Sequence, residues 1–232
     1  MIEKWGAKLA GSDFDLSDWR EELKEPFDPY VELISRDNDR LNVLWSKEFV
    51  NLETADEVRQ RAIGLIHQLN GIMYLQRRCQ PLVFGGSARL VDGKVLVDHF
   101  VELPSATIRM RGNAIMVQIV RDGVVQPPPP PVKSTAQTLL ETAGGDDVVA
   151  DIFGYISSAI DWYDLYKVIE LCESKLGGEH SLGIAVGGKA KPWKAAKTTA
   201  NFFRHARAYR PETLMPFGEA KDVVLSIVRL IL

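Results

Sequence analysis

The sequence of 232 residues has little cysteine and no histidines at metal-ligand spacing. Its two cysteines, Cys79 and Cys172, lie far apart in apolar patterns of helical period. They predict buried free thiols and exclude a disulfide framework or a four-cysteine zinc site. His67, His99 and His180 have no ligand partner close in the sequence. We therefore predict neither a metal site nor a cofactor.

The chain also lacks an apolar run long enough for a transmembrane helix. Its most apolar stretch, residues 223–232, is interrupted by Ser226 and Arg229 and is shorter than the ~20 residues that a spanning helix needs. The first residues lack the cationic start and apolar core of a secretion signal. The absence of a Gly-x-Ser-x-Gly elbow argues against conventional hydrolase chemistry. These absences predict a cytoplasmic protein without a membrane partner.

A run of five prolines at residues 127–131 divides the chain. Such a run cannot join a helix or a central strand, and it favours a stiff, extended spacer. We therefore predict an α+β domain at residues 1–125, a linker at 126–132 and an α-helical domain at 133–232.

The first domain has strand signals around one helical signal. Branched and aromatic residues at 30–34 and 41–50 flank a turn and predict a hairpin. A capping box at 54–57 and apolar residues at helical spacing predict one long helix over 55–78. We expect this helix to cover one face of a curled antiparallel sheet. Four further strand-like runs occupy residues 82–91, 94–103, 106–111 and 114–121.

Beyond the linker the strand signal disappears, and helical periodicity continues to the end of the chain. The pattern is typical of an α-helical bundle of about a hundred residues. Predicted helices occupy residues 134–143, 147–158, 161–176, 192–209 and 217–232.

The distribution of charge is uneven. Residues 189–210 contain seven basic side chains and no acidic one, so the remainder of a chain of net charge -3 carries about -10. A basic segment on an acidic protein indicates a polyanion partner such as RNA. The basic residues are Lys189, Lys191, Lys194, Lys197, Arg204, Arg207 and Arg210.

Helical geometry collects part of this segment on one face, which carries Lys194, Lys197, Thr198, Asn201, Arg204 and His205. Three interpretations remain open: a solvated helix face, polyanion binding without chemistry, or catalysis. In the catalytic case, His205 exchanges a proton, Arg204 and Lys197 stabilise a phosphate, and Asn201 orients one of its oxygens. For nucleic-acid contacts, the predicted residues are Lys194, Lys197, Arg207 and Arg210.

The segments Thr199-Ala200-Asn201 and Arg204-His205-Ala206 resemble the carboxy-terminal "TAN...RHA" motif of a group of uncharacterised bacterial proteins. More distantly, this helical region is similar to the HEPN superfamily. That resemblance implies a helical bundle acting as a metal-independent ribonuclease in bacterial defence or toxin systems, with an active site formed across a dimer. The superfamily places its histidine four to six residues after the polar residue that follows its arginine, whereas Arg204 and His205 are adjacent here.

Two functions follow from these patterns. In the first, the chain is an RNA- or polyanion-directed protein, with RNA cleavage as its chemistry if it is an enzyme. In the second, it is a non-catalytic interaction subunit whose helical domain binds a second copy or a protein partner, as the apolar residues 223–232 suggest. An exposed cleft at Arg204 and His205 would favour catalysis, and internal hydrogen bonds there would favour the second function.

Overall fold

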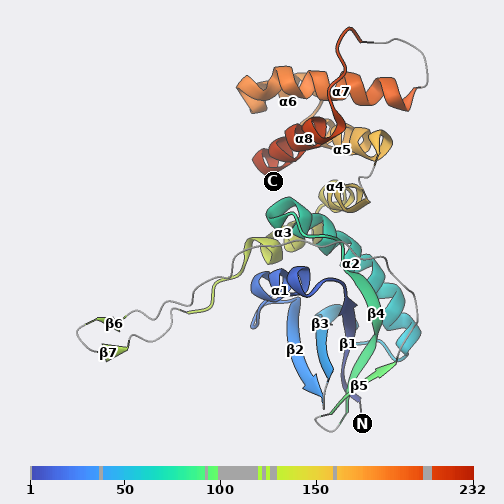
Figure 1. Cartoon of the computed structure of the whole chain (residues 1–232), viewed down its shortest axis with the longest axis vertical. Coiled ribbons are helices and arrows are strands. Elements are labelled where there is room, and N and C mark those ends of the chain that lie inside the picture. Colours follow the sequence, from blue (N-terminus) through green and yellow to red (C-terminus); the bar gives the residue numbers. More distant parts are fainter. Residues whose placement is uncertain are drawn as a thin grey trace.

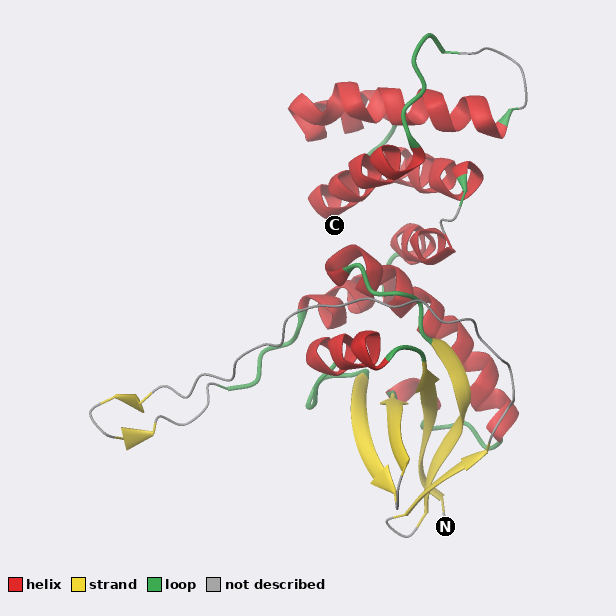
Figure 2. Cartoon of the chain, viewed as in Figure 1, coloured by secondary structure: helices red, strands yellow, loops and turns green. Residues whose placement is uncertain are grey.

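The computed structural model describes residues 2–36, 39–91, 94–98, 120–121, 124–125, 130–158, 161–205 and 211–232. The fold is α+β, as predicted. An antiparallel sheet and two helices form one end of the molecule, a third helix packs beside these two, and the remaining described helices stack toward the other end (Figures 1 and 2).

The main sheet has five antiparallel strands in the order β2-β3-β1-β4-β5. The predicted hairpin is confirmed as β2 and β3, and a second hairpin joins β4 to β5. The central strand β1 was not predicted, although its buried residues Trp5, Ala7 and Leu9 alternate with period two. The bounds are β1 (Ile2–Ala10), β2 (Tyr30–Arg36), β3 (Asp39–Trp45), β4 (Val83–Val91) and β5 (Lys94–Asp98).

The predicted long helix is confirmed as α2 (Ala55–Arg77). Thr54 accepts a hydrogen bond from the Glu57 backbone N–H, and the Glu57 carboxylate accepts one from the Thr54 N–H, which completes the capping box. The helix packs on β4 and β1, and its buried side chains form the core beneath the sheet. A shorter helix, α1 (Asp13–Glu22), and a 3-10 turn, η1 (Lys47–Phe49), complete this end.

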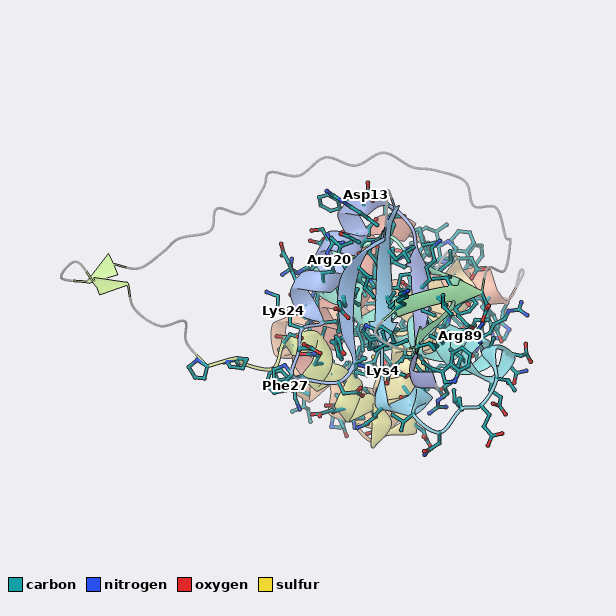
Figure 3. All side chains as sticks on the ribbon, turned by 90° about the horizontal axis from the view of Figure 1, so that it is seen from below. Lys4, Asp13, Arg20, Lys24, Phe27 and Arg89 are labelled. Carbon is teal, nitrogen blue, oxygen red and sulfur yellow. The ribbon has the colours of Figure 1, made fainter. Side chains whose placement is uncertain are left out.

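The opposite face of the sheet carries a smaller apolar cluster around Val43 and Trp45. Lys4 lies over the rings of Tyr30 and Trp45, with its ammonium 4.5 and 4.6 Å from their centres (Figure 3). Gly6 leaves room for the indole, since a Cβ there would lie 2.7 Å from Trp45 Cε3. Side chains of the sheet itself therefore cover Val43 and Trp45 on this face.

The carboxy-terminal part is helical, as predicted. Asp161 caps α5 by accepting hydrogen bonds from the Tyr163 and Asp164 N–H groups, and Gly177 and Gly178, both at positive φ, follow its end. The elements are α3 (Thr135–Gly144), α4 (Asp147–Ser158), α5 (Trp162–Lys175), α6 (Glu179–Val186), η2 (Gly187–Lys189), α7 (Ala190–Arg204) and α8 (Phe217–Ile231). A separate two-stranded sheet joins β6 (Val120–Arg121) to β7 (Val124–Val125).

One buried core runs through both ends of the molecule. Helix α2 crosses α4 at Gly71, where a Cβ would overlap the Phe153 carbonyl oxygen. Arg229 of α8 donates a hydrogen bond from Nε to the Leu75 carbonyl oxygen of α2, at 3.0 Å. Helix α2 thus belongs to the packing of both predicted domains. The domain boundary itself stays a prediction, since most of the linker lies outside the described residues.

Other predictions need correction or fall outside the described residues. The helix predicted over 192–209 begins at Ala190 and ends at Arg204. The prediction placed its end too late because no glycine or proline marks a stop between Arg204 and Pro211. Helices α1 and α6 were not predicted. The strand runs at 106–111 and over most of 114–121 lie outside the described residues. Among the described helices, none is both long and apolar enough to cross a membrane.

Candidate polyanion-binding site

The candidate site lies where α7 packs against α5. Small residues on the buried face of α7, Ala196 and Ala200, are fully buried and allow close packing of the two helices. Trp193 is buried one turn earlier. Cys172 of α5 is also buried, and burial raises the pKa of its thiol to about 12. A neutral thiol is a poor nucleophile, so Cys172 is a core residue and not a candidate catalytic group.

Lys197 is held by two acidic residues from different helices. Its ammonium donates to both carboxylate oxygens of Glu173 at 2.8 Å and to Glu179 at 2.7 Å. Only 22% of the Lys197 side chain and 13% of the Glu173 side chain are exposed. Lys197 therefore joins α7 to α5 and α6, and its charge is largely neutralised within the protein.

Arg204 is held in a similar way at the end of α7. Its Nη1 lies 3.1 Å from Oε1 of Glu170, and its guanidinium lies 4.0 Å from the centre of the Tyr166 ring. Its Nε and Nη2 lie 3.0 and 2.6 Å from Nε2 of His205. Since a guanidinium only donates hydrogen bonds, Nε2 of His205 is the acceptor in this contact. Lys167 also pairs with Glu170, at 2.9 Å.

A polar depression of about 230 Å³ opens beside these ion pairs. Four residues of α7 that carry hydrogen-bond donors line it: Lys194, Lys197, Thr198 and Asn201. Lys194 keeps most of its charge available, because its side chain is 67% exposed and its Nζ lies 3.9 Å from Oε1 of Glu179. Tyr166 and Glu179 complete the lining.

The ion pairs shift the pKa values of their members. The hydrogen bond from Lys197 is the main cause that lowers the pKa of Glu179. Burial alone raises the pKa of Glu170, but Lys167 and Arg204 more than offset this and lower it. Burial lowers the pKa of Lys197, and the two glutamates more than reverse that effect. All these groups are therefore charged at neutral pH.

The structure brings the predicted residues Lys194, Lys197 and Asn201 to one concavity, with Arg204 and His205 one turn further along. His205 lies just after the last helical residue. Arg207 and Arg210 lie outside the described residues. Sequence reasoning missed the acidic partners Glu170, Glu173 and Glu179, which come from other helices. The spacing of three between Glu170 and Glu173 in α5 was the available signal that these two carboxylates share a helix face, since residues i and i+3 do so.

Comparisons of the chain with protein-family models, with curated proteins and with solved structures find no match. The resemblance to the HEPN superfamily therefore stays a prediction.

Proposed function

We propose that the protein binds a polyanion, with RNA as the expected class, at the depression beside α7, and that it does not cleave it. The observation that carries this proposal is a concave site lined by Lys194, Thr198 and Asn201, at which the ammonium of Lys194 keeps its charge available. Such donors suit phosphate oxygens. Lys189 and Lys191 are exposed near the start of α7 and extend the positive surface.

Binding without cleavage follows from the state of His205 and Arg204. A general base needs a free lone pair within reach of the proton that it removes. The Nε2 lone pair of His205 faces the Arg204 guanidinium, and Arg204 is itself held by Glu170. The ring nitrogen and the cation that cleavage would require are thus engaged with each other.

The competing function, an interaction subunit, rested on the apolar end of the chain. In α8 the residues Val224, Leu225, Ile227 and Val228 are buried in the protein's own core. The apolar end is therefore mostly covered within the protein. The internal hydrogen bonds of Arg204 and His205 argue against catalysis, as in the interaction function, but they also fit polyanion binding without cleavage.

The test measures fluorescence anisotropy of a labelled single-stranded RNA titrated with the full chain at low salt. Lys194→Glu should weaken binding about tenfold, since it replaces an attraction by a repulsion at an exposed position. Lys24→Glu, an equal charge change at an exposed residue of the other end, is the matched control and should bind like the wild type. Equal loss in both variants, or no RNA binding by the wild type, would contradict the proposal.

The same samples test the absence of chemistry. RNA recovered after prolonged incubation should migrate as intact material on a denaturing gel. Shortened products that disappear in His205→Ala would show that the protein is a nuclease. Binding to a single-stranded DNA of the same sequence should also be measured. If the DNA binds as tightly as the RNA, the site is a general polyanion site and not an RNA site.

A further inference from the structure

Strand β2 is one edge of the five-stranded sheet, and no strand among the described residues pairs with its outer side (Figure 1). Proteins commonly protect such an edge with a proline, a β-bulge or a covering element, because unpaired backbone groups there can pair with another chain. The residues of β2 include no proline, and their register with β3 runs without a bulge. The other edge strand, β5, ends at Asp98, beyond which the chain lies outside the described residues. β2 is therefore an open edge of the described sheet.

The backbone groups on the outer side of β2 belong to alternate residues. In an antiparallel pair every second residue bonds to the neighbouring strand, and the residues between them point away from it. Val31 donates its N–H to the carbonyl oxygen of Leu23, which belongs to no strand, at 2.9 Å. Val31, Leu33 and Ser35 are therefore the outward residues. Among the described residues, no hydrogen-bond partner is found for the backbone of Leu33 or Ser35.

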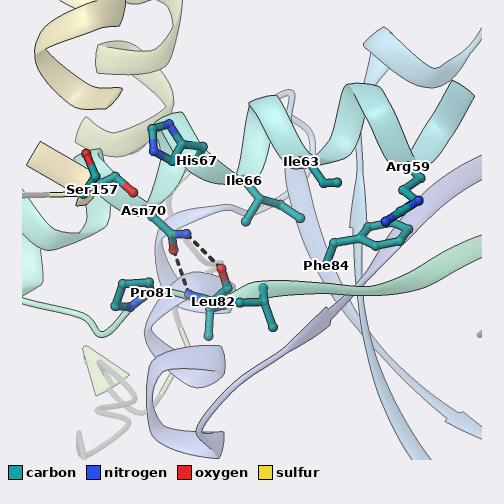
Figure 4. Close-up of a pocket in the computed structure, with 11 residues that line it drawn as sticks. Arg59, Ile63, Ile66, His67, Asn70, Pro81, Leu82, Phe84 and Ser157 are labelled. Atoms are coloured by element: carbon teal, nitrogen blue, oxygen red, sulfur yellow. Dashed lines mark hydrogen bonds between the residues drawn. The ribbon is translucent and has the colours of Figure 1, made fainter. Parts of the chain in front are cut away.

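Comparable backbone groups near β4 are satisfied within the protein. Asn70 of α2 donates to the Leu82 carbonyl oxygen and accepts from the Leu82 N–H, both at 2.8 Å, just before β4 begins (Figure 4). No described side chain does the same for Leu33 or Ser35. Their N–H and C=O groups are therefore available to a partner strand.

Apolar side chains flank these open groups on both faces of the sheet. Leu33 is 40% exposed, and Ile34, which points to the opposite face, is half-buried. Glu32 is exposed as well. One of its carboxylate oxygens accepts a hydrogen bond from the Trp45 indole N–H at 2.9 Å, which leaves the other oxygen for a partner. The open edge thus combines hydrogen-bonding groups, apolar surface and a negative charge.

We propose that β2 pairs antiparallel with β2 of a second copy of this chain, about a two-fold axis at Ile34. In this register Leu33 faces Ser35 of the partner subunit, and the two residues exchange both N–H···O bonds through groups that are free in the monomer. Ile34 faces its own copy, and Glu32 faces position 36, where the sequence has an arginine. A two-fold axis at Leu33 would instead need the N–H of Val31, which is already bonded. The axis at Ile34 is therefore the register that fits both the free groups and the charges.

Cysteine cross-linking of the full chain tests the register. In Ile34→Cys the two-fold axis sets the two Cα atoms about 4.5 Å apart, within the ~4.4–6.8 Å that a disulfide spans. Mild oxidation should therefore give a covalent dimer on a non-reducing gel. Glu32→Cys is the matched control, because its two copies would lie about 13 Å apart and should stay unlinked. The native Cys79 and Cys172 are buried, so the wild type should show no covalent dimer. Equal cross-linking of both variants would refute this register.

Light scattering during size-exclusion chromatography tests the dimer without a cross-link. The wild type should have about twice the monomer mass of 25.9 kDa at high micromolar concentration. Leu33→Lys brings like charges together across the axis, and Ser35→Pro removes an outward N–H while leaving the bonds to β3, so both variants should elute as folded monomers. Val50→Lys, the same charge change at a 69% exposed residue outside β2, should remain a dimer. A monomeric wild type, or a dimer that survives both β2 variants, would refute the proposal.

Discussion

Replacing Lys197 by methionine tests whether the ion pairs of α7 hold the helical part together. Methionine keeps the apolar stem and removes the ammonium, so Glu173 loses both of its 2.8 Å hydrogen bonds from Lys197 while only 13% of its side chain is exposed. Breaking a fully buried pair costs about 3–5 kcal/mol, and breaking an exposed pair costs about 0–1 kcal/mol. This pair is largely but not fully buried, so we expect a loss of about 2 kcal/mol in the free energy of unfolding.

Thermal denaturation followed by circular dichroism measures this loss as a fall in Tm of about 4–8 °C for a chain of this length. Lys194→Met is the control, because its 67% exposed side chain and its 3.9 Å contact with Glu179 predict a change below about 0.5 kcal/mol. Adding Glu173→Gln to Lys197→Met should restore part of the stability, since the unpaired charge is removed. Equal Tm values for the two lysine variants would refute the structural role of Lys197.

Two further predictions concern packing and pH. Gly71→Ala should lower the free energy of unfolding by about 1–3 kcal/mol, because the added methyl group would overlap the Phe153 carbonyl where α2 crosses α4. Urea denaturation measures this loss, and an unchanged midpoint would contradict the close crossing. Because the folded-state pKa of Glu179 lies below the ordinary value of 4.5, its contribution is present above that pH and is lost as pH falls through the lowered pKa. Wild type should therefore lose more stability than Glu179→Gln between about pH 5 and pH 3, and parallel losses would contradict the pairing.

Much of the fold could be predicted because local signals and tertiary packing agree. The long helix was bounded by a capping box and by the end of its apolar period, and the structure places it at Ala55–Arg77. Strand β1 was missed, although Lys4, Gly6 and Lys8 alternate with Trp5, Ala7 and Leu9 as in a strand with one buried face. Its role as the central strand comes from pairing with β3 and β4, and such long-range pairing has no local signature.

The candidate site was predictable only in part, for an electrostatic reason. Spacing along one helix grouped Lys194, Lys197 and Asn201, and these three residues line one depression. Local spacing cannot show that Lys197 and Arg204 meet carboxylates of α5 and α6, since those contacts join residues 18 to 34 positions apart. Pairing with carboxylates changes a basic stripe into a partly neutralised surface with Lys194 as its most available charge.

The central claim is that the depression beside α7 binds a polyanion and that Glu179 competes with it for the two lysines. The most direct measurement is the affinity of Glu179→Gln for single-stranded RNA as a function of salt. Removing this carboxylate should tighten binding relative to wild type, whereas Lys194→Gln should weaken it and make the salt slope shallower by about 0.7 per lost phosphate contact. The RNA should be recovered intact after titration with either variant. Unchanged or weaker binding by Glu179→Gln, with the protein still folded, would contradict the account.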